Sequence, residues 1–255
     1  MESNNINKLA WNIAVGLSFI CLLYLPARDH FSISENDGNY LTLLTLIPSG
    51  IGYTLLVTLL GSLSAIAVGL LVGLGKLSRL PAAQFAASLY TEILRGLPLL
   101  VVLFYIYYAL GEFLHVPALL AAVVSFGFSY GAYMADVFRA GIQSIPQEQI
   151  EAARNLGMSG KQATREIVLP QALKTIVPAV GNQILGMLKD TSLVSILAIS
   201  DILRVGNEYA TKHFNYFETY TFIALTYLVL TLLMSRLIQK LEERLKTPEQ
   251  GIQLI

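Results

Sequence analysis

Long apolar stretches recur along the whole chain, and they limit the environments in which it can fold. A helix of roughly 20 mostly apolar residues crosses a bilayer core about 30 Å thick. Read against this length, the sequence contains about six candidate spans. They are Leu9–Pro26, Gly50–Gly75, Leu97–Leu114, Val116–Phe138, Ile176–Leu197 and Phe217–Leu237. The sequence therefore predicts an all-α membrane protein with about six transmembrane helices.

Composition agrees with a membrane location and excludes several other classes. Only 13% of the 255 residues are charged, whereas soluble domains carry about 25%. The 17 basic residues are matched by 17 acidic ones, which argues against a nucleic-acid-binding protein. One cysteine, Cys21, and three scattered histidines predict neither a disulfide framework nor a metal site.

The distribution of basic residues predicts the orientation. With the C-terminus in the cytoplasm, most lysines and arginines of the connecting segments also face the cytoplasm, as the positive-inside rule requires. The numbers of basic residues on the two sides are nearly equal only at the first stretch, which Lys8 precedes and Arg28 follows. No small-x-small cleavage site follows Leu9–Pro26, so we interpret it as an uncleaved helix. The sequence thus predicts a multi-pass protein with both termini inside.

A patterned segment separates the fourth and fifth stretches. Pro146 is suited to the first turn of a helix, and Gly157 is suited to its end. Ser159 and Gln162 form a capping-box pattern for a second short helix, which we expect to end near Leu169 because proline follows. The residues alone predict a helix–turn–helix, and they leave open an amphipathic linker lying on the membrane.

The same segment resembles the signature loop of the permease subunits of ATP-binding-cassette (ABC) importers. The shared pattern is E-A-A, three residues, G, nine residues, then I-x-L-P. Its residues here are Glu151, Ala152, Ala153, Gly157, Ile167, Leu169 and Pro170. The resemblance implies that this loop docks, as a coupling helix, on a separate ATP-hydrolysing subunit.

Three further segments resemble the branch of that family which imports polar amino acids. They are Tyr90–Leu100, Tyr130–Gly141 and Lys189–Leu193. The resemblance covers roughly Gly50–Leu245 and implies a five-helix type I core, so the first stretch would be an added helix. The expected organisation is an N-terminal helix and external loop over residues 1–48, a transmembrane domain over 49–240 and a cytoplasmic tail over 241–255.

Charged residues flank a helix break near residue 96. Glu92 and Arg95 are spaced so that they can pair on one helix face. Gly96 and Pro98 then interrupt the helix. The four residues are either an interfacial salt bridge with its helix end or a gate and hinge. Asp136 and Arg139 have the same spacing, and we expect a structural pair there.

A second charged pair falls inside a predicted span. Ionisable residues at membrane depth are costly and usually face a water-filled path or a partner. The candidate translocation path consists of Asn182, Gln183, Lys189, Asp190, Thr191 and Ser192. Buried ion pairing is the alternative.

Small residues recur every four positions at Gly61, Ala65, Gly69 and Gly73, which predicts close helix packing. Gly69–Ser78 faintly resembles a phosphate-binding loop, but it lacks the required first glycine and the final Ser or Thr. We therefore expect no cofactor on this chain and no enzymatic activity of its own.

By resemblance, the partners are a second permease chain, identical or not, two ATP-binding subunits that carry ATP and Mg²⁺, and a periplasmic or lipid-anchored binding protein. The alternatives are an ion-coupled secondary transporter using Lys189 and Asp190, and a membrane-embedded enzyme, for which no suitable cluster is visible. The neutral Asn182 and Gln183 favour neutral or acidic amino acids or cystine as the substrate.

Overall fold

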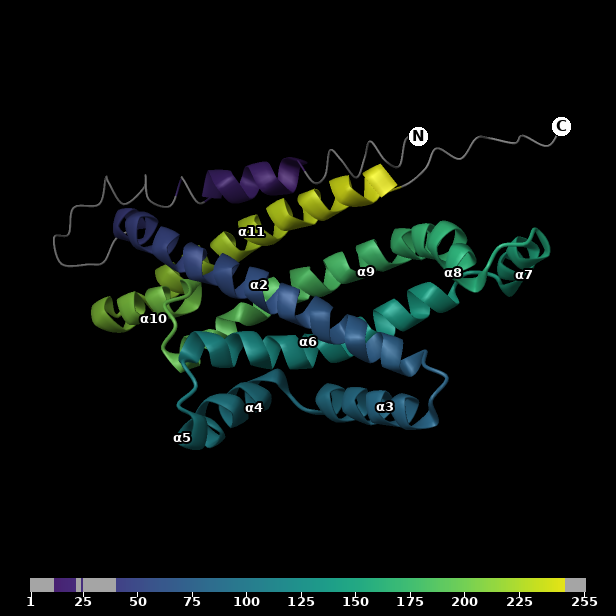
Figure 1. Ribbon diagram of the computed structural model, residues 1–255. Helices are drawn as coiled ribbons and strands as arrows, with labels where there is room; N and C mark the ends of the chain where they lie inside the picture. The colour runs from purple at the N-terminus through teal and green to yellow at the C-terminus, as the bar shows by residue number, and fades with distance from the viewer. Residues whose placement is uncertain (1–11, 22–23, 25–39, 246–255) are drawn as a thin grey trace. The chain divides into compact units, whose positions relative to one another are not determined.

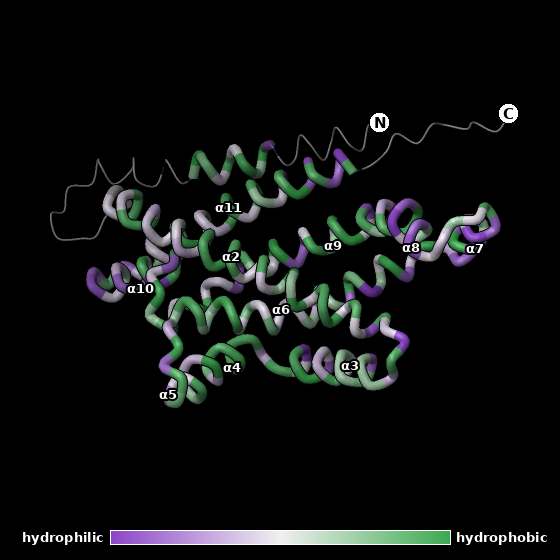
Figure 2. Tube along the Cα trace, in the orientation of Figure 1, coloured by the Kyte–Doolittle hydropathy of each residue, from purple (hydrophilic) through white to green (hydrophobic). Residues whose placement is uncertain are grey.

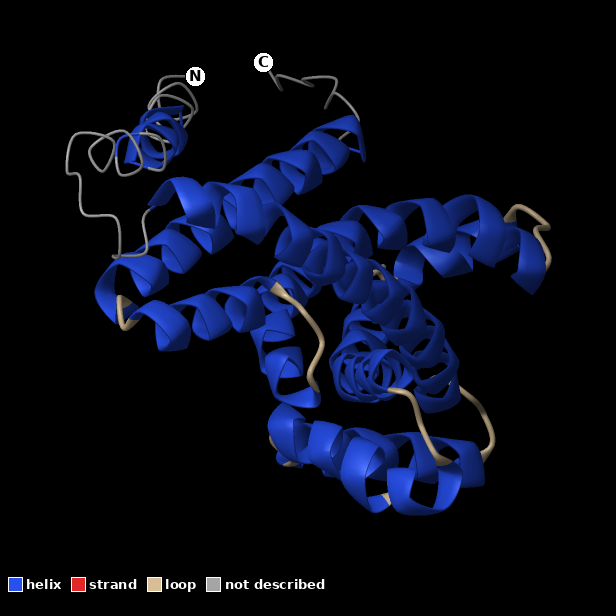
Figure 3. Ribbon diagram, turned by 90° about the vertical axis from the view of Figure 1, so that its left-hand side faces the viewer, coloured by secondary structure: helices blue, strands red, loops and turns tan. Residues whose placement is uncertain are grey.

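The computed structural model describes residues 12–21, 24 and 40–245. All regular secondary structure in these residues is helical (Figures 1 and 3). After a helix at Asn12–Cys21, the elements are α2 Tyr40–Lys76, α3 Pro81–Gly96, α4 Leu99–Phe104, a π turn Tyr105–Ala109, α5 Gly111–Leu114, α6 Ala118–Gln143, α7 Gln147–Asn155, α8 Gly160–Ala163, a π turn Thr164–Val168, α9 Leu169–Asp190, a 3-10 helix Thr191–Leu197, α10 Ile202–His213 and α11 Tyr216–Leu245. The predicted all-α class is confirmed.

Three helices are long and apolar enough to cross a membrane alone. They are Thr42–Lys76 in α2, Ala118–Gln143 in α6 and Tyr216–Leu245 in α11. Two bent pairs pass the same test: α3 with Leu99–Leu114, and Gly160–Leu197 with α10. Figure 2 shows hydrophobic residues along much of α6 and hydrophilic ones gathered on α7 and α10. By length and composition, the described residues therefore contain between three and five candidate spans.

The expected third span differs from the structure, and the expected first span lies partly outside the described residues. Of Leu9–Pro26, only Asn12–Cys21 and residue 24 are described, and the external loop Asp29–Asn39 lies outside the described residues. The expected span Leu97–Leu114 is the second half of a bent pair, because α3 precedes it as a separate helix at an angle of 102°. Leu97 has extended φ and ψ angles of −99° and 134°, the conformation that a residue before proline prefers.

The helix expected to end near Leu169 does not end there. The chain passes from α8 through the π turn directly into α9, which contains Pro170 in its first turn. Proline is tolerated in a first turn, and a π turn changes the hydrogen-bonding pattern just before it. That expectation was wrong because Pro170 follows a π turn within a helical stretch that continues from α8 into α9.

The chain divides into two compact units. The first unit comprises the residues up to Ser62, Leu99–Phe126 and Leu185–Met234. Its core is an apolar cluster formed by α2, α10 and α11: Leu43, Ile47, Ile202, Tyr209, Phe222 and Ile223. A Cβ atom at Gly50 would lie 2.8 Å from the Cα atom of Ile202. Glycine therefore permits the close approach of α2 to α10.

The second unit comprises Leu63–Pro98, Gly127–Ile184 and the residues from Ser235 onward. In this unit α2 packs closely against α6. A Cβ atom at Gly69 would lie 2.6 Å from the Met134 Cβ atom, and one at Gly73 would lie 3.0 Å from the Ala135 carbonyl oxygen. The predicted packing role of the small residues is confirmed at these two positions.

Candidate functional site

A helical elbow forms where the signature segment was predicted. The α7 helix ends before Gly157, whose φ angle is +81°. The Ser159 side chain accepts a hydrogen bond from the Gln162 backbone N–H, and the Gln162 side chain accepts one from the Ser159 N–H at 2.8 Å. The capping box and the glycine turn are therefore confirmed, and they define a short, locally specified turn between α7 and α8.

The elbow has a buried side and an exposed side. Ala153 and Ala163 are buried, whereas Glu151 and Ala152 are exposed. Leu156 at the turn is 84% exposed, although it is a large apolar residue.

The two ends of the signature lie close together. The Gln171 side-chain amide on α9 donates to the Gln149 side-chain oxygen on α7 at 2.7 Å. Ile167 is half-buried in the π turn, and Leu169 and Pro170 are exposed at the start of α9. The structure thus brings the signature residues to one end of the second unit.

A single carboxylate joins three helices in the second unit. Asp136 on α6 pairs with Lys76 of α2 at 2.8 Å and with Arg95 of α3 at 2.7 Å, and Arg139 approaches it at 3.7 Å. We call these four residues the Asp136 hub. The expected pair between Glu92 and Arg95 is wrong, because Arg95 reaches Asp136 instead. The expected pair between Asp136 and Arg139 is confirmed, and its distance of 3.7 Å is the longest of the three ion pairs of Asp136.

Two more contacts hold α3 against α6. The Tyr90 hydroxyl donates to the Phe128 carbonyl at 2.7 Å, and the Arg95 guanidinium lies over the Tyr133 ring, 5.2 Å from its centroid. These contacts position the end of α3 just before Gly96 and Pro98. Sequence reasoning missed the contact of Tyr90 with Phe128 and that of Arg95 with Asp136, because the partners are about 40 residues apart in the chain.

The residues proposed for the translocation path all lie on α9 or just beyond it. Asn182 and Lys189 are exposed, and Gln183 and Asp190 are half-buried. The α9 helix ends at Asp190, and the 3-10 helix that follows begins with buried Thr191. The Thr191 hydroxyl donates to the Leu188 carbonyl at 2.7 Å, and Ser192 follows it.

The first unit also contains a buried polar network that the sequence did not reveal. Asp201 is fully buried and accepts hydrogen bonds from the backbone N–H groups of Leu203 and Arg204 at the start of α10. The Tyr227 hydroxyl donates to the same carboxylate at 3.2 Å, and the Ile202 N–H donates to Thr54 at 3.4 Å. An aspartate directly before the apolar residues Ile202 and Leu203 is a helix N-cap signal, and it could have predicted that Asp201 lies at the start of α10.

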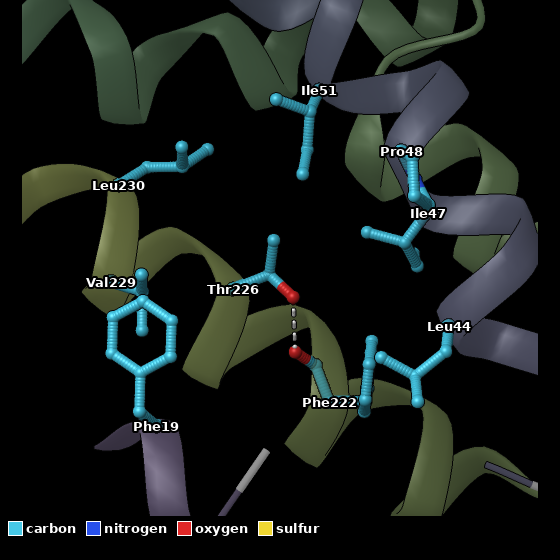
Figure 4. Close-up of a pocket in the computed structure, with 9 residues that line it drawn as sticks. All are labelled: Phe19, Leu44, Ile47, Pro48, Ile51, Phe222, Thr226, Val229 and Leu230. Atoms are coloured by element: carbon cyan, nitrogen blue, oxygen red, sulfur yellow. Dashed lines mark hydrogen bonds between the residues drawn. The ribbon is translucent and has the colours of Figure 1, made fainter. Parts of the chain in front are cut away.

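An apolar cavity of about 230 Å³ lies in the first unit. Its lining comes from α2, α11 and the helix Asn12–Cys21 (Figure 4): Phe19, Leu44, Ile47, Pro48, Ile51, Phe222, Thr226, Val229 and Leu230. The Thr226 hydroxyl donates to the Phe222 carbonyl at 2.8 Å, as Figure 4 shows. The lining therefore lacks the polar groups that a polar solute needs.

Taken together, the apolar helices define a multi-pass membrane protein. A family model described as "Binding-protein-dependent transport system inner membrane component" matches residues 65–247. The chain belongs to this family of inner-membrane permease components.

Similar proteins are named for amino-acid transport. The chain is 38% identical to the probable amino-acid permease protein YxeN of Bacillus subtilis, over 80% of this chain and 90% of that one. It is 32% identical to the glutamine transport system permease protein GlnP of Escherichia coli, over 80% of this chain and 94% of that one. A crystal structure of an amino acid ABC transporter with histidines superposes on this chain with a TM-score of 0.75 at 38% identity. The match covers 80% of this chain and 96% of that one.

Proposed function

We propose that this chain is the permease subunit of an ATP-driven importer that carries a polar amino acid across the cytoplasmic membrane. The names of its relatives support the substrate class. The observation that carries the proposal is the elbow between α7 and α8. It bears the signature residues, turns at a positive-φ glycine and presents an exposed leucine.

In this proposal the elbow docks on an ATP-binding subunit. Glu151, Ala152 and Gly157 form the contact, with Leu156 as its apolar tip, and the buried Ala153 supports them from within the elbow. Two permease chains and two ATP-binding subunits assemble, and a binding protein delivers the amino acid from outside. ATP and Mg²⁺ bind the partner subunits, so this chain supplies no catalytic residue. Closure of the ATPase pair would move the elbows, and a central site would then open alternately to the two sides of the membrane.

The transport path would follow α9. Asn182, Gln183, Lys189 and Asp190 would contact the amino acid or the water around it, together with Thr191 and Ser192. Glu92, Arg95, Gly96 and Pro98 would form the gate or hinge, since the helix breaks there. The transmembrane domain is proposed to occupy about residues 49–240, with both termini in the cytoplasm. Neutral amides on the path favour a neutral or acidic amino acid, and glutamine is the first substrate to test.

Gly157→Asp provides the test of docking. A Cβ atom at a φ of +81° costs about 1 kcal/mol or more, and a charge buried unpaired against the partner costs several more. We expect the variant to insert normally and to lose binding-protein-stimulated ATP hydrolysis and glutamine uptake in proteoliposomes. Nothing lies within 4 Å of a Cβ atom at this position, so the chain itself does not exclude the side chain.

Gly157→Asn is the matched control, because asparagine tolerates a left-handed conformation and adds no charge. It should retain more coupled ATP hydrolysis than the aspartate variant. Wild-type uptake and stimulated ATP hydrolysis in Gly157→Asp would show that the elbow is a surface linker. Uptake without any ATPase subunit, insensitive to vanadate, would instead support an ion-coupled secondary transporter.

A further inference from the structure

The Asp136 hub carries more positive charge than its one carboxylate can neutralise. Lys76, Arg95 and Arg139 all approach the same Asp136 side chain. Gln143, which accepts a hydrogen bond from Arg139 at 3.1 Å, is neutral. Glu92 is the nearest acid along α3, but the described residues include no ion pair for it. Two positive charges are therefore left without a counter-charge in the hub.

The two arginines are accessible, whereas the lysine is not. The side chain of Lys76 is 11% exposed, but those of Arg95 and Arg139 are 49% and 41% exposed. Each guanidinium has five N–H donors, and the recorded contacts use only part of them. The Arg95 guanidinium carbon also lies 5.2 Å from the centroid of the Tyr133 ring, a contact with the face of the ring that does not consume N–H donors. The N–H fork of a guanidinium suits the oxygens of a phosphate group.

The hub also lies where a lipid headgroup would be. Lys76 is the last residue of the α2 span, and Arg139 lies near the end of the α6 span. On the side of α3 that carries Phe85, Leu89 and Ile93, the helix exposes a stripe of large apolar side chains, as a helix beside acyl chains does. Basic groups between helices at a membrane surface attract anionic headgroups.

We propose that Arg95 and Arg139 bind the phosphate of an anionic membrane lipid. Asp136, itself held by Lys76, keeps the two guanidinium groups in place. The lipid would join the ends of α3 and α6, immediately before the break at Gly96. This proposal requires only that the chain spans a membrane, and it does not depend on the substrate or on the docking elbow.

Native mass spectrometry of the full-length protein tests the proposal. The protein in detergent is mixed with phosphatidylglycerol or with phosphatidylcholine of the same acyl chains. We expect phosphatidylglycerol to be retained in preference. The double variant Arg95→Gln/Arg139→Gln should weaken its retention by about fivefold for each guanidinium removed. Excess inorganic phosphate should not displace the lipid, and displacement would mean that the site takes a free anion.

Lys240→Gln/Arg244→Gln is the control, because it removes two exposed basic residues from the end of α11 and leaves the hub intact. Equal loss in both double variants would mean general surface attraction and would overturn the proposal. Wild-type retention in the hub variant, with loss of a protein subunit instead, would assign the arginines to a protein contact and would also overturn it.

A single variant keeps the test valid if the double variant does not fold. Arg139→Gln leaves the contacts of Asp136 with Lys76 and Arg95 in place. It should melt near the wild-type temperature and still lose about fivefold in phosphatidylglycerol retention. Unchanged retention in this folded variant would overturn the proposal.

Discussion

Tyr227 and Tyr220 lie on the same helix, but their hydroxyl groups have different surroundings. Tyr227 donates to the fully buried Asp201, whereas Tyr220 donates to Asn207 at the surface. We expect Tyr227→Phe to lower the free energy of unfolding by about 1–3 kcal/mol, because a buried carboxylate loses a donor. Tyr220→Phe should change it by less than about 0.5 kcal/mol. Unfolding of the purified protein measures both, and equal effects would show that Asp201 does not depend on Tyr227.

Lys189 and Asp190 are the residues on which the proposed path most depends. Lys189→Ala and Asp190→Ala should each reduce glutamine uptake by at least about tenfold, because loss of 1.4 kcal/mol of interaction with a transported solute has that effect. The amount of inserted protein should stay near wild type. Lys174→Ala, on the same helix but outside the path, is the control. If both path variants transport normally, these residues do not contact the substrate.

At the scale of elements, the contact between α2 and α6 depends on glycine. We expect Gly69→Ala to lower the free energy of unfolding by about 1–3 kcal/mol, because its methyl group would overlap Met134. Gly52→Ala, on the same helix, meets nothing within 4 Å and should have little effect or stabilise the helix. Thermal unfolding in detergent compares the two. A Gly69→Ala variant as stable as Gly52→Ala would mean that α2 and α6 have room to separate.

Two prolines show why helix ends are difficult to assign from sequence. We expected a break at both Pro98 and Pro170. Before Pro98 the chain is extended and the helix direction changes by 102°. Pro170 lies in the first turn of α9, and the chain stays helical on both sides. Proline disrupts the turn that precedes it, so its effect depends on where the helix begins.

For the whole molecule, orientation remains the main prediction. We expect a reporter that is active only outside the membrane to be inactive after Ser78 and after Leu245, and active after Phe214. The physical reason is the retention of lysine and arginine on the cytoplasmic side. Phe214 lies between α10 and α11, so the sites after Phe214 and after Leu245 test opposite ends of the α11 span. Activity after Leu245 would reverse the proposed orientation.

The sequence by itself determined the features that depend on neighbouring residues. Apolar runs predicted the long helices, although α2 begins at Tyr40, earlier than expected. The capping box at Ser159 and the turn at Gly157 were predicted from a few adjacent residues, and both formed as expected. Such signals are local, because a cap or a glycine turn is stabilised by groups within about four residues.

Only the tertiary structure decided which distant groups meet. Arg95 could have paired with Glu92 one helical turn away, but the packing of α3 against α6 brings it to Asp136. Asp201 is a charged residue that the fold buries fully, with the Tyr227 hydroxyl as one of its donors. These choices depend on how helices pack, since a charged side chain takes the partner that best replaces the water it loses.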